Sequence, residues 1–496
     1  MIDGKKGRLT FVVLALALGG SAATAQAARA TSQPVAVSLT QDGPVESLKT
    51  RNCLPRLASS DIAADHAGCL ELQVLEAGHD AYVVLPLPQS VLLDRRSKLT
   101  AYVRAAESNG PVLMRWIAMD EDNGLIFQRQ FEIVGGAWQR MEWPLPMWRW
   151  GNEKMGAWSE VKSLVLRVES QASEILLDQL AVEADDSVEA AAEEGMIKLA
   201  YANRPASMVR IDEFLVSTDA LEEVPQEQLV AIVDHMKRIR GWIRRNFAGA
   251  NKPVEDGGPV AMFVFRKREH YAEFFRNLGR QWSVDILPPA CSGYTIQDIC
   301  AATWEPPPDG KIRPVYLHEA THALVSRELR LLTGEPSQAW LQEGLANYLQ
   351  LCLFPKSMRR DQYVKHFAQP IDKDSFFRPL SEILGKPVAS ARYAQLASLT
   401  AFLVQERPQW LQELAAGLAQ KKDIKAILKE HDLTLDELQR QWMQWGQKEF
   451  AESTKDEIRP FPLPQEWTQA LPPATDQMPR QQSQAPRQAI QPVLPR

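Results

Sequence analysis

The chain has 496 residues, of which 45% are hydrophobic and 24% are charged, and its formal net charge is −6. This length is sufficient for two or three domains, and the composition is that of a water-soluble globular protein. The modest negative charge and the lack of a basic tract argue against a nucleic-acid partner. Beyond the N-terminal segment, no run of about twenty apolar residues predicts a transmembrane segment in the mature chain.

The segment 1–27 has the features of a secretory signal peptide. Lys5, Lys6 and Arg8 supply a positive start, "LTFVVLALAL" supplies a short apolar core, and "SAATAQA" supplies small residues for cleavage after Ala27. A retained anchor helix is the alternative, although the apolar run is short for spanning a bilayer. We therefore expect a periplasmic or secreted protein.

Five cysteines fit an oxidising compartment. Two pairs are close in sequence, so we predict one disulfide between Cys53 and Cys69 and another between Cys291 and Cys300. Cys352 then remains as a small apolar group inside a helix. The sequence alone leaves other pairings open.

Residues 35–185 predict an all-β domain. Runs rich in Val, Ile, Leu and aromatic residues, such as "DAYVVLPL", "SKLTAYVRAA" and "VLMRWIAMD", are separated by turn-forming stretches such as "SNGP" and "EDNG". Many short strands with almost no helix favour a β-sandwich. The strand order and the closing pattern "SEVKSLVLRVES" then "SEILLDQLAVE" resemble the galactose-binding-like jelly roll of many carbohydrate-binding modules. This resemblance implies a glycan or another cell-envelope ligand as a partner of the domain.

Trp148 and Trp150 have two interpretations in this domain. Their aromatic faces suit stacking on sugar rings from a loop, and they equally suit a place at the edge of the sandwich core. We expect the core position and predict no sugar site from these residues.

The second half of the chain predicts a mainly helical α+β domain at 205–452, joined to the sandwich by a linker or short helix at 186–204. In "EQLVAIVDHMKRIRGWIRRNF" the apolar residues recur at helical spacing, and "PVAMFVFRKREHYAEFF" reads as a strand turning into a helix. Thr434 and Glu437 form the pattern of a capping box at the start of a late helix. The segment 459–496 is rich in Pro and Gln, and we expect it to be disordered.

The stretch "VYLHEATHALVSREL" contains the pattern H-E-x-x-H. Pro314 can begin a helix here, and the "TG" of Thr333 and Gly334 can end it. On such a helix His318 and His322 lie on one face and can bind a single ion. Glu319 then points beside that ion, where a base must lie to deprotonate a water.

A catalytic zinc site needs three protein ligands and one open position. Glu343 in "AWLQEGLANY" lies 21 residues after His322, which leaves room for a turn and the start of a second helix. A carboxylate pressed against the first helix without a partner would be costly, and coordination of a metal ion removes that cost. The sequence therefore predicts a Zn²⁺ site of His318, His322 and Glu343. The alternative is a histidine pair and a glutamate in ordinary surface hydrogen bonds.

"HEATH" followed by "WLQEGLANY" resembles the gluzincin metallopeptidases, particularly the peptidase-MA-like bacterial envelope proteins, and more distantly thermolysin and the zinc aminopeptidases. The resemblance runs from about residue 205 to 450. It implies that His318, His322 and Glu343 bind zinc and that Glu319 is the general base. Asn347 matches a position that often supports the first histidine, with simple solvent exposure as the alternative.

A transition-state donor is expected downstream of the third ligand, as in related gluzincins. Tyr393 in "ARYAQLASLTAFL", 50 residues after Glu343, is the candidate, with plain packing as its alternative role. Arg392 is a weaker candidate, and Tyr348 is expected to be structural. A substrate would pair with an edge strand, for which "YTIQDICAATWE" is the candidate.

These observations predict an exported zinc metallopeptidase that acts on a peptide or protein substrate. The G-x-M-E-N motif with which aminopeptidases hold a free amino terminus is missing, so an endopeptidase fits better. Two alternatives remain: a non-catalytic envelope scaffold built on a peptidase-like domain, and a zinc hydrolase of another amide substrate.

Overall fold

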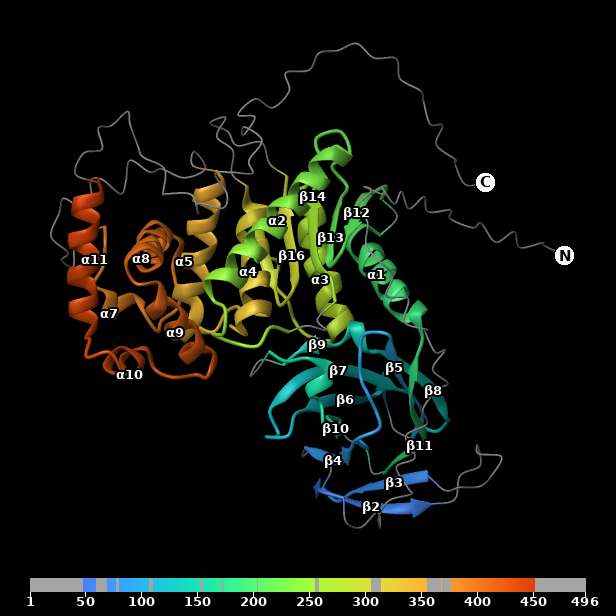
Figure 1. Ribbon diagram of the computed structural model, residues 1–496. Coiled ribbons are helices and arrows are strands. Elements are labelled where there is room, and N and C mark those ends of the chain that lie inside the picture. Colours follow the sequence, from blue (N-terminus) through green and yellow to red (C-terminus); the bar gives the residue numbers. More distant parts are fainter. Residues whose placement is uncertain are drawn as a thin grey trace, which may run out of the picture.

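The computed structural model describes most of residues 48–450 (Figure 1). The gaps in this range are 59–68, 77–79, 107–109, 152–154, 171, 173, 203, 255–257, 305–313, 355–366 and 368–375. The predicted signal peptide and the predicted disordered tail lie outside the described residues. Among the described helices, none combines the length and the apolar character needed to span a bilayer.

The N-terminal region is a sandwich of two antiparallel sheets, as the alternating short strands predicted (Figure 1). Its strands are β1 (Thr50–Arg51), β2 (Cys53–Ala58), β3 (Cys69–Val74), β4 (Ala81–Pro86), β5 (Ser97–Ala105), β6 (Val112–Met119), β7 (Leu125–Ile133), β8 (Gln139–Pro144), β9 (Arg149–Trp150), β10 (Ser163–Val168) and β11 (Glu174–Ala184). Within the described residues, one sheet has the order β1-β4-β10-β6-β7-β9 and the other the order β2-β3-β11-β5-β8.

Aromatic side chains fill the space between the two sheets. Phe131 packs against Trp143 with ring centroids 4.7 Å apart. Trp148 and Trp150 are also buried, and Trp150 stacks on Phe127 at 6.1 Å. The expected core position of these two tryptophans is therefore confirmed, and neither offers an open face to a sugar.

The segment that we expected to be a linker or a short helix is the long helix α1 (Asp186–Tyr201). Asp185 caps its first turn by accepting a hydrogen bond of 2.8 Å from the backbone N–H of Ser187. At its other end Tyr201 is buried, and its hydroxyl lies 3.1 Å from Ser217 Oγ. The connection is thus packed against the second domain.

The second domain is built on a mixed sheet with the order β12-β13-β14-β16-β15 among the described residues. Its strands are β12 (Ser207–Ile211), β13 (Phe214–Thr218), β14 (Val260–Phe265), β15 (Gly293–Ile296) and β16 (Ile299–Thr303). β13, β14 and β16 are parallel, while β12 and β15 run antiparallel at the two edges. The central strands are buried along their whole length, and β14, "VAMFVF", is apolar throughout, as expected for a strand covered on both faces.

Helices cover both faces of this sheet. α1 and α3 (Arg268–Trp282) pack with Phe263 and Phe265 on one face. On the other face, α2 (Gln226–Asn246) and α4 (Val315–Leu329) pack with Met262 and Val264. α4, which carries the histidine pattern, is therefore held against the sheet beside its antiparallel edge.

The C-terminal part is helical, as predicted (Figure 1). It contains α5 (Pro336–Leu353), α7 (Leu380–Ile383), α8 (Tyr393–Glu406), α9 (Pro408–Ala419), α10 (Ile424–Lys429) and α11 (Leu435–Phe450). Before α11, the backbone N–H of Glu437 donates a 3.1 Å hydrogen bond to Thr434 Oγ1, which is one half of the predicted capping box.

Both predicted disulfides are wrong. Cys53 and Cys69 stand at opposite ends of the β2–β3 hairpin, where Cys53 pairs with Val74 and Cys69 with Ala58. Five residue steps along a strand span about 16 Å, far more than a disulfide can bridge. Cys300 lies opposite Thr295 in the β15–β16 hairpin. Thr295 is four residues along the chain from Cys291, so no disulfide joins Cys291 and Cys300 either.

Gly344 permits the close approach of α5 and α8. A Cβ atom at this position would lie 2.3 Å from Thr400 Oγ1 and 3.2 Å from the carbonyl oxygen of Leu396. We predict that Gly344→Ala lowers the free energy of unfolding by about 1–3 kcal/mol, because the two helices must separate. Urea denaturation measures the change.

Two further variants control for this prediction. Gly195 lies inside α1, and a Cβ atom added there would meet no neighbouring atom within 4 Å, so Gly195→Ala should stabilise the protein by up to about 1 kcal/mol. Adding Thr400→Ala to Gly344→Ala should restore part of the lost stability, since it removes the clashing hydroxyl. A Gly344→Ala protein as stable as the wild type would contradict the close packing of α5 and α8.

Candidate metal centre

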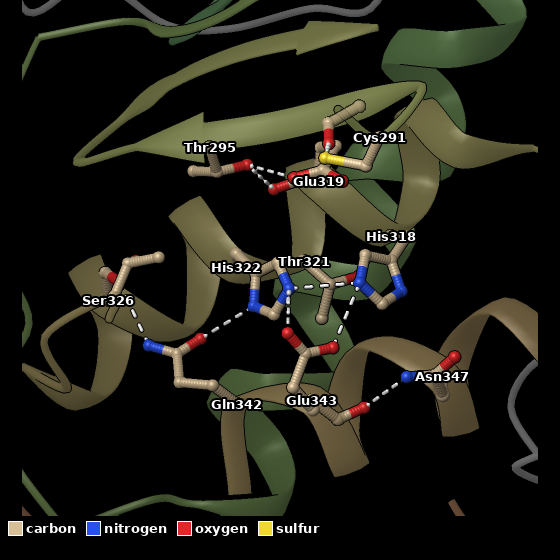
Figure 2. A network of polar contacts seen from close by, with 12 residues as sticks. Cys291, Thr295, His318, Glu319, Thr321, His322, Ser326, Gln342, Glu343 and Asn347 are labelled. Atoms are coloured by element: carbon tan, nitrogen blue, oxygen red, sulfur yellow. Dashed lines mark hydrogen bonds and ion pairs between the residues drawn. The ribbon is translucent and has the colours of Figure 1, made fainter. Parts of the chain in front are cut away.

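His318 and His322 project from one face of α4, as their spacing predicted (Figure 2). Their Nε2 atoms lie 3.1 Å apart, and the two rings meet nearly edge to face, with centroids 4.7 Å apart. Both side chains are buried. α4 therefore directs two imidazole nitrogens to one point inside the protein.

The ends of α4 are set partly by tertiary contacts. The helix begins directly after Pro314, as expected, but it ends at Leu329, before the predicted Thr333–Gly334 stop. Arg330 adopts a left-handed conformation with φ 57°. Its guanidinium pairs with Glu160 of the sandwich, at 2.6 and 2.9 Å, so the sandwich holds the residue that ends the helix.

Glu343 on α5 brings a carboxylate to the same point (Figure 2). Its Oε2 atom lies 3.2 Å from His318 Nε2, and its Oε1 atom lies 3.6 Å from His322 Nε2. One potential ligand atom from each of the three residues lies within 4.8 Å of the others. The three predicted ligands thus converge.

The arrangement of these atoms fits a divalent cation. Glu343 Oε2 is buried, and the hydrogen-bond partners of this carboxylate are the His318 imidazole and the Tyr393 hydroxyl. Burial alone would raise the pKa of Glu343, but the imidazoles of His322 and His318 hold this pKa below its usual value. Two facing imidazole nitrogens and one carboxylate are a donor set that zinc accepts in catalytic sites, with a fourth position left open. The residues present therefore fit Zn²⁺.

Gln342 fixes the orientation of His322, a role that the sequence did not predict. Its side-chain Nε2 donates to Leu331 O at 3.0 Å and to Ser326 Oγ at 3.2 Å. The amide oxygen therefore faces His322 Nδ1, 3.1 Å away, and accepts a hydrogen bond from its N–H (Figure 2). This leaves the lone pair of His322 Nε2 directed at the cluster. A buried polar residue directly before Glu343 was the only signal in the sequence.

Asn347 has neither of its expected roles. It is buried rather than exposed, and its side-chain amide donates a 2.7 Å hydrogen bond to the backbone oxygen of Glu343, one turn earlier in α5 (Figure 2). It therefore supports the backbone of a ligand and not the ring of His318.

Glu319 lies beside the ligand cluster and points towards β15, as predicted for a base (Figure 2). Thr295 Oγ1 lies 2.9 Å from its Oε2 atom and 2.8 Å from its backbone oxygen. Burial raises the pKa of Glu319 to about 7, although the electrostatic effect of His322 acts to lower this pKa. Gly293 makes room for this side chain, because a Cβ there would lie 2.8 Å from both Glu319 Cγ and Oε1.

β15 is the edge strand predicted from "YTIQDICAATWE". The backbone N–H of Thr303 donates to Ser292 O at 2.7 Å, which places the inward hydrogen bonds at Ser292 and at alternate residues after it. The N–H and C=O groups of Gly293 and Thr295 therefore point to the outer edge. This edge runs along the side of the cleft where Glu319 lies.

Tyr393 also reaches the site from the first turn of α8. Its ring centroid lies 5.5 Å from that of His318. Burial, together with the nearby carboxylates of Glu343 and Glu319, raises the pKa of Tyr393 above its usual value, so the hydroxyl keeps its proton and can donate. Its neighbour Arg392 is bonded to the carbonyl oxygen of Phe376, away from the cluster.

An open cleft of about 630 Å³ surrounds these groups. It is lined by the three ligand residues, Glu319, Tyr393, the β15 residues Gly293, Tyr294 and Thr295, and the segment around Thr333 and Gly334. Tyr348, expected to be structural, is buried outside it and packs against Trp242 at 5.8 Å. A polymer chain can thus reach both the candidate base and the candidate ligands.

No protein-family model and no curated protein matches this chain. Solved structures match over about 30% of it, the share that forms the sandwich. The family 11 carbohydrate-binding module from Clostridium thermocellum is 10% identical, covers 30% of this chain and 95% of its own, and has a TM-score of 0.25. The family 30 module of a cellulosomal cellulase from Clostridium thermocellum is 12% identical, with 31% and 99% covered and a TM-score of 0.25.

A third match is the CBM22-1 xylan-binding domain of Xyn10C from Paenibacillus barcinonensis. It is 11% identical, covers 31% of this chain and 92% of its own, and has a TM-score of 0.22. The strand order and register of the chain itself define the sandwich.

We predict that the cluster binds one Zn²⁺ per chain and that its affinity reports the roles assigned above. Glu343→Gln should abolish tight binding, because it removes a charged ligand. Gln342→Ala should weaken binding about 10- to 100-fold, because His322 is no longer held in the productive orientation. Titration of the chelator-stripped protein with Zn²⁺ in competition with a metal indicator measures these affinities.

Asn347→Ala is the matched control, since Asn347 is buried on the same helix but contacts no imidazole. It should keep an affinity within about threefold of the wild type. An equal loss of Zn²⁺ affinity in Gln342→Ala and Asn347→Ala would show that the amide of Gln342 does not orient His322.

Proposed function

We propose that this chain is an exported zinc-dependent metallopeptidase, and specifically an endopeptidase. The observation that carries this proposal is the convergence of His318, His322 and Glu343 within a cleft that also contains a buried carboxylate, Glu319, and an open strand edge. Each of these features has a separate use in the hydrolysis of an amide bond. Export is inferred from the N-terminal sequence, which precedes the described residues.

The edge of β15 would bind the substrate main chain. The outward N–H groups of Gly293 and Thr295 and the C=O group of Thr295 can pair with an extended peptide, which adds itself to the sheet as a further strand. The Gly293 carbonyl already accepts a 2.8 Å hydrogen bond from the Cys291 thiol. Because an open strand edge and an open cleft accept the middle of a chain, an endopeptidase fits this geometry. Pairing here would carry the peptide past Glu319.

Each candidate catalytic group would then have a separate role. Zn²⁺ bound by the cluster would supply a Lewis acid that makes water nucleophilic near neutral pH and polarises the scissile carbonyl. Glu319 would accept the proton of the attacking water and pass it to the leaving nitrogen. Thr295 holds one oxygen of this carboxylate, which leaves the other for the proton. The Tyr393 hydroxyl would donate to the negative oxygen that develops on the substrate.

Glu319→Gln tests the proposed chemistry. An amide cannot accept the proton, so we expect kcat/KM on a cleaved peptide to fall about 10²- to 10⁴-fold while zinc content and stability stay at wild-type levels. Peptide libraries analysed by mass spectrometry identify the cleaved sequences. Removal of the metal with a chelator should abolish cleavage, and added Zn²⁺ should restore it.

Tyr393→Phe is the matched variant for the donor. It keeps the ring that packs against His318 and loses only the hydroxyl, so kcat should fall about 10²-fold with little change in KM. An unchanged kcat would mean that Tyr393 only packs against His318 and donates no catalytic hydrogen bond. A zinc-bound wild type that cleaves no peptide in a broad library would favour the scaffold alternative.

For the sandwich we propose a cell-envelope glycan as partner. A hollow of about 240 Å³ lies on the outer face of the six-stranded sheet, and Arg51, Asp80, Tyr82 and Arg167 contribute to its lining. An aromatic ring beside a few polar groups is a suitable combination for binding a sugar.

Tyr82→Ala should abolish binding on a glycan array, whereas Tyr102→Ala on the other sheet should not. Equal binding by Tyr82→Ala and wild type would remove this hollow as the glycan site.

A further inference from the structure

A second hollow, between the sandwich and the sheet of the second domain, continues the metal cleft. It has a volume of about 720 Å³, and its lining includes Arg149 and Trp150 of β9 and the β15 residue Ile296. Tyr294, Thr295, Thr333 and Gly334 line both this hollow and the metal cleft. The two spaces therefore join along β15, and we call the second one the interdomain groove.

Direct hydrogen bonds hold the sandwich against the tip of the β15–β16 hairpin. The side-chain amide of Gln297 accepts a 3.0 Å hydrogen bond from the backbone N–H of Trp150 and donates a 2.8 Å bond to its carbonyl oxygen. Arg129 of the sandwich also donates to the backbone oxygen of Gln281, at 2.9 Å. A peptide extended along β15 would therefore run from Glu319 towards the edge of β9.

Arg149 is the cation that such a peptide would meet. It is half-buried and lies opposite Gln128 in the β7–β9 pairing, with Arg115 nearby. Glu169, the acid on this face, is paired with Arg115 at 2.9 Å. No carboxylate of the described residues forms an ion pair with Arg149. A partly buried cation without a paired anion gains from an incoming carboxylate.

The carboxylates in the groove do not supply that partner. Asp285 and Glu335 also contribute to its lining, from the segments after α3 and before α5. Asp285 is exposed, and Glu335 accepts a 3.2 Å hydrogen bond from Ser337. Neither is paired with Arg149, so the sandwich side of the groove keeps an uncompensated positive charge.

We propose that the interdomain groove is the distal part of the substrate cleft and that Arg149 binds an acidic side chain of the peptide. This inference rests on the proposed peptidase function and adds a substrate class to it. Thr295, which contacts Glu319, and Gln297, which contacts Trp150, are two residues apart, or about 7 Å along a strand. The acidic residue therefore lies about two to four positions from the scissile bond.

Matched peptides test this assignment. A cleaved sequence is prepared with Glu or Gln at each of the second to fourth positions on either side of the scissile bond. The wild type should cleave at least one Glu peptide with a kcat/KM about tenfold or more above that of its Gln counterpart. Arg149→Glu should reduce this ratio at least tenfold, and Arg149→Gln should bring it close to one.

Arg56→Glu is the control for charge reversal, because Arg56 is exposed on β2 of the other sheet. It should leave the Glu-to-Gln ratio unchanged. Urea denaturation verifies that all three variants are folded. A wild-type ratio of one at every position, or a ratio that Arg149→Glu does not alter, would overturn the assignment.

A binding measurement separates failure of this inference from failure of the peptidase proposal. In the Glu319→Gln background, fluorescence anisotropy gives the affinity of the labelled peptides without turnover. Tighter binding of a Glu peptide that is lost in Glu319→Gln/Arg149→Glu supports the groove independently of the rate of cleavage. Cleavage by the wild type together with equal affinities for Glu and Gln peptides overturns the groove and leaves the peptidase proposal standing.

Discussion

The burial of a carboxylate between two imidazoles is the constraint around which the second domain is organised. Glu343 loses most of its hydration when α5 packs against α4, and a buried carboxylate without a partner is strongly unfavourable. A bound cation would offset this cost by taking the place of that water. The close contact of α5 with α8 at Gly344 keeps the carboxylate in position, and the buried amide of Gln342 keeps one imidazole facing it.

The features of this site that were predicted from the sequence are those that depend on a short stretch of the chain. The helical spacing of His318 and His322 is a property of a single helix and was predicted correctly. Glu343 was predictable because the apolar residues around it show which face of α5 is buried. The contacts of Gln342 and Asn347 depend on side-chain conformations and on the exact rotation of α5, which no spacing rule contains. Arg330, at which α4 ends earlier than predicted, is held by Glu160, which is 170 residues away in the chain.

The errors have the same physical origin. Nearness in sequence suggested two disulfides, but antiparallel pairing places the cysteines of each pair at different positions along their hairpins. The segment 186–204 was predicted as a linker or a short helix. Its burial becomes apparent only when Tyr201 meets Phe263 and Phe265 from the sheet. The sandwich, by contrast, was predictable from strand alternation, and β14 from its continuous apolar run, whereas the strand order of the mixed sheet was not predicted.

The sandwich touches both elements that frame the candidate site, and this joins the two domains functionally. Glu160 binds the residue that ends α4, and the backbone of Trp150 binds Gln297 at the tip of the hairpin that contains β15. The first contact fixes the helix that carries the histidines, and the second fixes the strand edge that faces Glu319. A sandwich attached at only one of these points could move independently of the cleft. Because it is attached at both, its β9 edge lines the groove that joins the cleft of the candidate metal centre.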